Sequence, residues 1–205
     1  MNKDLKIVLA ILGIIGAGLL FIYGSVLPVL KSQAYINAAQ SLPSVRTVQE
    51  FENNFDKVFN FYSPVGGEES AKYLMGNILS VVSAQKDQPE EVTRELIRYV
   101  EEKTYPDTRH YLSMANLYTM ELMRSSQEAD YEAAVNYYLK ARANGPKLPP
   151  VLYGLLTLYQ AKGDVAGIQE VGGAILKLWP QDARVSELLA GFELEQVLKK
   201  AAEKK

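Results

Sequence analysis

Residues 130–146 have the sequence DYEAAVNYYLKARANGP, and this stretch decides the fold of the chain. It alternates small residues, such as Ala134 and Ala141, with large aromatic residues, such as Tyr138. Small residues on a helix let an antiparallel neighbour approach closely, while the large residues fill the space to the next pair of helices. The stretch therefore predicts one helix of a closely packed helix pair.

The layout around this stretch occurs twice. Pro146 and Pro180 are 34 residues apart, and each follows an aromatic and leucine-rich helix, a turn and a second helix. A fixed period of this length is typical of repeat architectures. The corresponding residues are Tyr111, Met114, Ala115, Tyr118, Asp130, Tyr131, Ala134, Tyr138, Ala141 and Pro146 in the first copy, and Leu152, Leu155, Leu156, Tyr159, Gly163, Asp164, Ile168, Gly172, Ile175 and Pro180 in the second.

This pattern resembles the tetratricopeptide repeat (TPR) family over residues 107–181, and residues 68–106 resemble a degenerate repeat that ends at Pro106. The resemblance implies an all-α fold in which antiparallel helix pairs stack as a short α-solenoid. The sequence departs from the family pattern at two places, which weakens the resemblance. The first copy has about seven extra residues between its helices, around positions 123–128, and the second has Ile168 and Gly172 where the family prefers a small and an aromatic residue.

An uninterrupted apolar segment lies near the N-terminus. It begins at Ile7, ends at Leu30 and carries no charged side chain. As a helix it would rise about 36 Å, which exceeds the hydrocarbon core of a bilayer at about 30 Å. Residues 1–31 are therefore predicted to form a transmembrane anchor, with Pro28 in the last turn, where a break is tolerated.

The charges that flank this segment bear on its orientation and its processing. Lys3 and Lys6, weighed against Lys31, favour a cytoplasmic N-terminus and an extracytoplasmic repeat domain. The same two lysines would also suit a cleaved signal peptide, which would release a secreted domain. No convincing small-x-small cleavage site follows Tyr23, so the uncleaved single-pass anchor is the prediction.

The rest of the chain divides into four parts. Residues 32–46 mix Ala, Asn, Gln and Ser and are interpreted as a juxtamembrane linker. Residues 47–106 form a helical region with the degenerate repeat, residues 107–181 hold two TPR-like repeats, and residues 182–205 form a C-terminal capping helix. The capping helix is expected to cover the last repeat with Val185, Leu188, Leu189, Phe192 and Val197.

The helical region opens with a recognisable start signal. Thr47 and Glu50 have the spacing of a capping box, in which the Thr side chain accepts a hydrogen bond from the helix. An aromatic stripe follows at helical spacing and is interpreted as packing core, with a groove for a partner as the alternative. The stripe consists of Val48, Phe51, Phe55, Val58, Phe59 and Tyr62.

Several chemistries are missing from the sequence. There is no cysteine, so disulfides, thiolate metal sites and cysteine nucleophiles are excluded. His110 is the sole histidine and, at a helix start, is expected on the surface, without a partner for metal binding or catalysis. Gly-rich phosphate loops are absent, and a net charge of −2 gives no footprint for nucleic acid. No catalysis, metal or cofactor is predicted.

The TPR resemblance implies binding of a protein or peptide partner on the concave face, which the first helix of each repeat forms. Asn116 stands where some relatives clamp a C-terminal carboxylate, but Leu112 replaces the lysine that such a clamp needs. The mixed polar groove suits an extended peptide, or a glycan. The groove-facing residues are Arg109, Leu112, Asn116 and Thr119 in the first copy and Tyr153, Thr157 and Gln160 in the second.

A looser resemblance concerns the order of the parts. A membrane helix, a polar linker, an aromatic helix and degenerate repeats are similar to the C-terminal tail of bacterial O-antigen ligase or polymerase-like membrane proteins. This second resemblance implies an accessory domain, or a fragment, of envelope polysaccharide assembly. The two hypotheses are thus a membrane-tethered TPR-like adaptor and an accessory domain for glycan assembly.

Overall fold

The computed structural model describes the backbone of residues 3–84, 88–103 and 105–202, and side chains as far as Phe192. Within these residues the chain forms helices and no strand, so the predicted all-α class is confirmed. The contacts divide the chain into two compact units. Unit 1 comprises residues 1–81 and 87–105, and unit 2 comprises residues 82–86 and 106–205.

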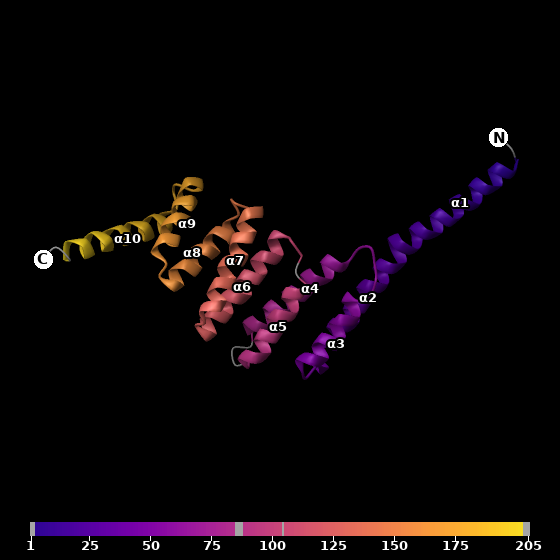
Figure 1. Ribbon diagram of the computed structural model, residues 1–205, viewed down its shortest axis with the longest axis horizontal. Helices are drawn as coiled ribbons and strands as arrows, with labels where there is room; N and C mark the ends of the chain where they lie inside the picture. Colours follow the sequence, from indigo (N-terminus) through magenta and orange to yellow (C-terminus); the bar gives the residue numbers. More distant parts are fainter. Residues whose placement is uncertain (1–2, 85–87, 104, 203–205) are drawn as a thin grey trace. The chain divides into compact units, whose positions relative to one another are not determined.

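The apolar N-terminal segment is helical, and the helix continues well beyond it. Helix α1 (Lys3–Phe21) passes through a π-helical turn, η1 (Ile22–Val26), into α2 (Leu27–Ser41), as Figure 1 shows. No residue of α1 is buried. Within the described part of the chain, this is the one helix long and apolar enough to cross a membrane.

Pro28 explains the π-helical turn. A proline inside a helix donates no backbone hydrogen bond, and its ring presses on the carbonyl group four residues earlier. The wider turn relieves this conflict, because the Leu27 N–H donates to the carbonyl oxygen of Ile22, five residues back. The helix therefore passes Pro28 without breaking.

The segment interpreted as a linker, residues 32–46, is mostly helical. Helix α2 extends to Ser41, and a 3₁₀ turn, η2, follows at Leu42–Ser44. Ala38 of α2 is buried, and the Ser41 hydroxyl oxygen accepts a hydrogen bond from Asn54 Nδ2 at 3.1 Å. This stretch thus packs against the domain as part of its fold.

Helix α3 (Val48–Phe59) begins at the predicted capping box. The Thr47 Oγ1 accepts a hydrogen bond from the Glu50 N–H at 3.1 Å, whereas the Glu50 carboxylate accepts from the N–H of Arg46. Phe51, Phe55 and Val58 are buried, which confirms the core interpretation for the middle of the stripe. Phe59 is half-buried and Tyr62 is exposed.

Two further helices complete the described part of unit 1: α4 (Gly67–Ala84), whose last three residues belong to unit 2, and α5 (Glu90–Glu102). Helix α5 packs on α3 through an aromatic and polar contact. The Tyr99 ring meets the Phe51 ring edge-on at 5.7 Å, and the Tyr99 hydroxyl donates to Asp56 Oδ1 at 2.9 Å. Burial, followed by this carboxylate, raises the pKa of Tyr99.

Residues 106–202, as far as the structure describes them, form five successive helices of unit 2: α6 (Thr108–Ser125), α7 (Glu128–Asn144), α8 (Pro149–Lys162), α9 (Val165–Leu178) and α10 (Ala183–Ala202). Helices α6 and α7, as well as α8 and α9, contact each other as pairs, and α7 also contacts α8. The first pair ends before Pro146 and the second before Pro180. The two prolines therefore mark the ends of the helix pairs, as predicted.

The extra residues of the first copy do not lie between its helices. Helix α6 continues to Ser125, so most of the insertion at positions 123–128 lengthens this helix instead. Ser126 then adopts a left-handed conformation, with φ of 56°, and its N–H caps the Leu122 carbonyl group. The expectation of a longer connection was wrong, because the sequence up to Ser125 contains no helix breaker.

Glycines allow close approach between the helices of unit 2. A Cβ atom on Gly154 would lie 2.4 Å from the Tyr138 ring, and one on Gly167 would lie 2.6 Å from the Tyr159 ring. Such distances are below any real contact, so the absence of a side chain at both positions is required by the packing. A tyrosine thus packs over a glycine once between α7 and α8 and once between α8 and α9.

Helix α10 begins directly after Asp182 and packs against α9. Asp182 accepts a hydrogen bond from the Val185 N–H at 3.0 Å, which makes it the N-cap. Val185 is fully buried, and the Leu189 side chain lies 3.0 Å from the position that a Cβ atom on Gly172 of α9 would occupy. The side chain of Val197, which was also expected to cover the last repeat, lies outside the described residues.

Candidate binding surfaces

A groove of about 560 Å³ lies within unit 1, between α2 and the beginning of α4. Its walls are mostly apolar, and several large side chains in them are exposed: Ile36 to 45%, Val65 to 58% and Tyr73 to 66%. The feature is therefore an open groove. The lining residues are Ser32, Tyr35, Ile36, Val65, Gly66, Glu69, Ser70 and Tyr73.

Tyr35 forms the floor of this groove and is fixed from three sides. Its ring lies 5.8 Å from the Phe55 ring of α3 and 5.9 Å from the Tyr73 ring of α4, measured between centroids. Its hydroxyl oxygen accepts a hydrogen bond from Asn77 Nδ2 at 3.0 Å. The groove is consequently held open by packed aromatic rings from three helices.

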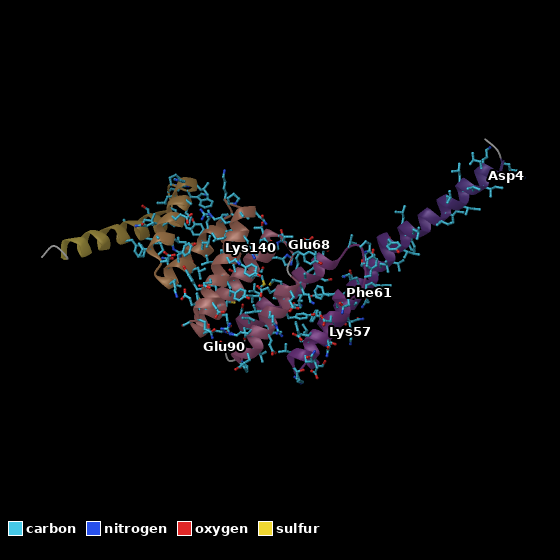
Figure 2. The ribbon with its side chains drawn as sticks, in the orientation of Figure 1. Asp4, Lys57, Phe61, Glu68, Glu90 and Lys140 are labelled. Carbon is cyan, nitrogen blue, oxygen red and sulfur yellow. The ribbon has the colours of Figure 1, made fainter. Side chains whose placement is uncertain are left out.

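Lys31 lies in α2, directly after the apolar segment, and connects this helix to the turn between α3 and α4. It is only 5% exposed, and its ammonium group donates to the carbonyl oxygen of Phe61 at 3.0 Å. In Figure 2 the labelled Phe61 lies next to the helix that carries this lysine. The Lys31 stem also lies 3.6 Å from the Cβ position of Gly66, whose φ of 90° favours glycine. Lys31 therefore holds the turn between α3 and α4 against α2.

The predicted concave-face residues lie on α6 and α8 of unit 2, two helices that contact each other. Three of them are engaged in hydrogen bonds inside the fold. The Asn116 side chain accepts from the Tyr138 hydroxyl at 2.8 Å, and the Thr119 hydroxyl donates to the carbonyl oxygen of its own helix at Ala115, at 2.7 Å. Tyr153 donates to the Asp182 carboxylate and stacks on Trp179.

The remaining concave-face residues are partly accessible. Arg109 and Thr157 are exposed, whereas Leu112 and Gln160 are half-buried. A partner on this face could contact these four directly, but it would have to compete with existing hydrogen bonds at Asn116 and Tyr153. The concave-face site stays a prediction, with a smaller accessible set than the sequence implied.

His110 is not a surface residue, contrary to the expectation for a lone histidine at a helix start. It is 2% exposed, and its Nδ1 lies 3.8 Å from a carboxylate oxygen of Asp107. The reason lies in the helical spacing, since Met114, Leu117 and Glu121 on the same face of α6 are buried too. This face belongs to the interior of the fold.

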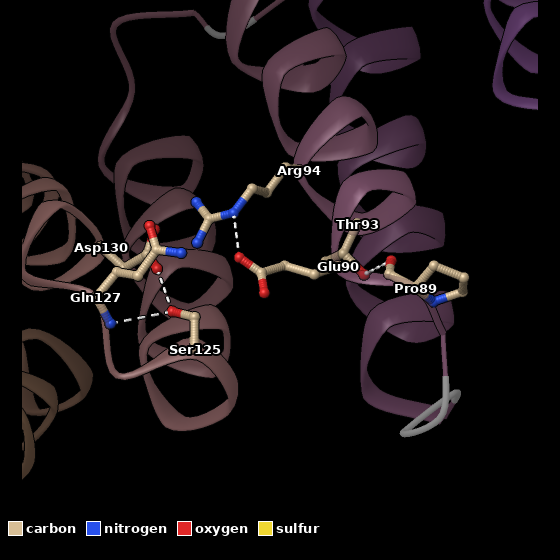
Figure 3. A network of polar contacts seen from close by, with 7 residues as sticks. All are labelled: Pro89, Glu90, Thr93, Arg94, Ser125, Gln127 and Asp130. Atoms are coloured by element: carbon tan, nitrogen blue, oxygen red, sulfur yellow. Dashed lines mark hydrogen bonds and ion pairs between the residues drawn. The ribbon is translucent and has the colours of Figure 1, made fainter.

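Polar contacts also stabilise two helix ends, namely the beginning of α5 and the end of α6. Within α5, Arg94 pairs with Glu90 at 2.8 Å, and the Thr93 hydroxyl donates to the Pro89 carbonyl oxygen at 3.4 Å (Figure 3). Within unit 2, the Ser125 hydroxyl donates to Asp130 at 2.6 Å and accepts from the Gln127 N–H at 3.1 Å. The second set joins the end of α6 to the beginning of α7.

The comparisons with known proteins give no assignment. No protein-family model, no curated protein and no solved structure matches the chain.

Sequence reasoning missed the groove because it assigned residues 32–46 to a linker. A signal for it was present, since Leu27, Lys31, Tyr35 and Ala38 recur at helical spacing from the end of the apolar segment onward. Lys31 and Ala38 are buried, and Leu27 and Tyr35 are half-buried. Because Lys31 is charged and Tyr35 carries a hydroxyl group, the pattern was not recognised as the buried face of an amphipathic helix.

Proposed function

We propose that this chain is a membrane-tethered helical adaptor, without catalysis of its own, that binds an apolar segment of a protein partner. The observation that carries the proposal is the groove between α2 and α4. Its exposed apolar walls begin on the same helix that is long and apolar enough to cross a bilayer. Exposed apolar surface of this kind marks binding sites in proteins.

The chemistry of the groove favours a peptide segment from another membrane protein. Its side chains supply apolar contacts through Ile36, Val65 and Tyr73, and the exposed Ser32 hydroxyl, which donates to the Pro28 carbonyl oxygen, can still accept a hydrogen bond. Glu69 is the one charged side chain in the lining and selects against acidic segments. A partner anchored in the same bilayer would reach the groove with a high effective concentration.

The resemblance to TPR proteins supports the same class of function and adds a second candidate surface in unit 2. There the accessible positions Arg109, Leu112, Thr157 and Gln160 would contact a peptide. An extracytoplasmic location of the domain is part of the proposal, because Lys3 and Lys6 favour a cytoplasmic N-terminus.

The proposal is tested by site-specific photocrosslinking in intact cells, which is simple because the chain has no native cysteine. Single variants Ile36→Cys and Tyr73→Cys carry a thiol-linked photocrosslinker in the groove, and Thr157→Cys carries it on α8. Lys57→Cys, at an exposed position of α3, is the matched control. Captured species are identified by mass spectrometry.

We expect one defined membrane protein to be captured from Ile36 and Tyr73 and to be absent from Lys57. Capture from Thr157 alone would move the site to the concave face of unit 2. Recovery of polysaccharide-assembly enzymes or lipid-linked glycan from the groove would favour the accessory-domain hypothesis. Equal capture from all four positions would contradict a specific binding surface.

A further inference from the structure

The turn between α3 and α4, residues 60–66, lies at the same level as the end of the apolar helix. The Tyr62 ring meets the Tyr23 ring of η1 edge-on, with 6.4 Å between centroids. The Lys31 ammonium group reaches the Phe61 carbonyl oxygen at 3.0 Å. Because helix side chains point toward the N-terminus, this ammonium lies closer to the apolar segment than the Lys31 backbone does.

This placement conflicts with a membrane crossing that continues to Leu30. An irregular turn has backbone N–H and C=O groups that no helix satisfies, and such backbone is not found exposed to the hydrocarbon of a bilayer. If residues 23–30 were within the hydrocarbon, the turn at residues 60–66 would be there as well. The hydrocarbon must therefore end near Tyr23.

The remaining helix can still cross a bilayer that thins locally around it. The 16 residues from position 7 to position 22 rise about 24 Å, some 6 Å less than an average hydrocarbon core. Lys6 and Lys3 can extend their ammonium groups outward from the other end, and a bilayer thins locally at small cost. The shorter span thus keeps all its charged groups in contact with water.

The side chains of the turn have the composition of a membrane interface. Tyr62 is 69% exposed and lies against Tyr23 of η1, and Val65, which also forms part of the groove wall, is 58% exposed. Tyrosine is enriched where the headgroups of a bilayer meet its hydrocarbon, because its ring is apolar and its hydroxyl is polar. Tyr23, 45% exposed on the helix itself, belongs to the same level.

From this geometry we propose that the turn formed by residues 60–66 is a second membrane contact, with Tyr62 and Val65 inserted into the headgroup region of the bilayer. The hydrocarbon is then crossed by residues 7–22, and η1 lies among the headgroups. The turn and the helix together hold unit 1 against the bilayer at two points. This inference rests on the membrane anchoring in the proposed function.

The depth of each position can be measured in the full-length chain, reconstituted in vesicles of phosphatidylcholine and phosphatidylglycerol. Because the chain has no native cysteine, single variants carry one nitroxide spin label each. Tyr62→Cys and Val65→Cys report on the turn. Leu12→Cys is the reference inside the hydrocarbon, and Lys57→Cys is the reference in water.

Electron paramagnetic resonance then gives the collision rate of each label with oxygen, which concentrates in lipid, and with a water-soluble nickel chelate. We expect the labels at positions 62 and 65 to collide with nickel about threefold less often than the label at 57, with an oxygen-to-nickel ratio between those of 57 and 12. This result supports insertion into the headgroup region.

The other outcomes separate the inference from the anchoring on which it rests. If the label at 12 is in lipid while 62 and 65 resemble 57, the turn is in water and the inference is overturned, but the anchor remains. Low collision rates with both reagents at 62 and 65 would show that protein covers the turn, and would also overturn it. A label at 12 with free access to nickel would refute the anchor itself.

Discussion

Units 1 and 2 are both helical, but each unit is stabilised internally by a different kind of contact. Unit 1 packs aromatic rings from several helices, with Phe55 at the centre, and includes hydrogen bonds from Lys31 and Tyr99. Unit 2 has a mostly aliphatic core and places tyrosine rings over Gly154 and Gly167. The membrane-spanning candidate helix contributes to unit 1 and not to unit 2.

This difference assigns a separate role to each unit. The core of unit 1 uses Tyr35 and Lys31 of α2, so its fold requires the helix that leads out of the apolar segment. Unit 2 is completed by its own last helix, α10, which covers α9. We therefore expect unit 2 to fold without the anchor and unit 1 to depend on it.

The strongest test of this separation removes one large buried side chain from each unit. Phe55 and Leu155 are both 0% exposed. Phe55→Ala should destabilise unit 1 by about 3–5 kcal/mol, and Leu155→Ala should destabilise unit 2 by about 2–5 kcal/mol, because each leaves a cavity. Hydrogen exchange measured by mass spectrometry in detergent follows both units at once.

Exchange should accelerate in α3 and α5 for Phe55→Ala, and in α8 and α9 for Leu155→Ala. If either substitution accelerated exchange equally throughout the described helices, the two units would form a single cooperative structure. The two units would then unfold together and could not be assigned separate stabilities.

A second test concerns the buried lysine that is specific to unit 1. Lys31→Met keeps most of the aliphatic stem but removes the hydrogen bond to the Phe61 carbonyl oxygen. A hydrogen bond from a charged group contributes about 1.5–3 kcal/mol, so we expect a loss in this range. Denaturant titration in detergent measures it, with the exposed Lys57→Met as the matched control. An equal, small effect of both substitutions would show that Lys31 does not hold the turn.

The sequence predicts helices in both units but not the contacts that α2 makes in unit 1, and the reason is physical. The helix pairs of unit 2 repeat with small residues and prolines at regular positions, so periodicity predicts two helix pairs there, each followed by a proline. The length of α6 was not predicted because the helix ends at Ser126, which has a left-handed conformation, and not at a glycine, the usual residue at such a position. In unit 1, the role of Lys31 and Tyr35 depends on hydrogen bonds with residues 30 and 42 positions away, which periodicity does not detect.

The candidate binding sites show the same limit, because their accessibility depends on contacts that the sequence does not reveal. The sequence selected Asn116 and Tyr153 as groove residues from their positions in the repeat, but it could not show that Tyr138 and Asp182 already occupy their polar groups. The groove of unit 1 was missed altogether. It forms between two helices whose pairing depends on the turn at residues 60–66, and a turn of this kind has no period.

A third test uses the glycines of unit 2. Gly167→Ala would place a methyl group 2.6 Å from the Tyr159 ring and should destabilise the unit by about 1–3 kcal/mol through overpacking. Gly173→Ala, in the same helix, meets nothing within 4 Å and should instead stabilise the helix by about 0.5–1 kcal/mol. Thermal unfolding followed by circular dichroism distinguishes the two signs. A stabilising Gly167→Ala would show that Tyr159 moves away without cost.

The smallest expected effect concerns the start of α10. The Tyr153 hydroxyl, and then the Val185 N–H, hydrogen-bond the Asp182 carboxylate and lower its pKa below the usual 3.8. A lowered pKa in the folded state means that the carboxylate stabilises α10 above pH 3.8, and that this stabilisation is lost as the pH falls through the lowered value. Trp179, the single tryptophan, stacks on Tyr153 and reports this transition by fluorescence.

Tyr153→Phe keeps the stacking ring but removes the larger cause of the shift. We expect the acid transition of Trp179 fluorescence to move to higher pH in this variant, toward 3.8. An unchanged midpoint would mean that Val185 and Arg184 lower the pKa of Asp182 without help from Tyr153. In that case the Tyr153 hydroxyl would be available to a partner, and Tyr153 would again count as an accessible residue of the predicted concave face.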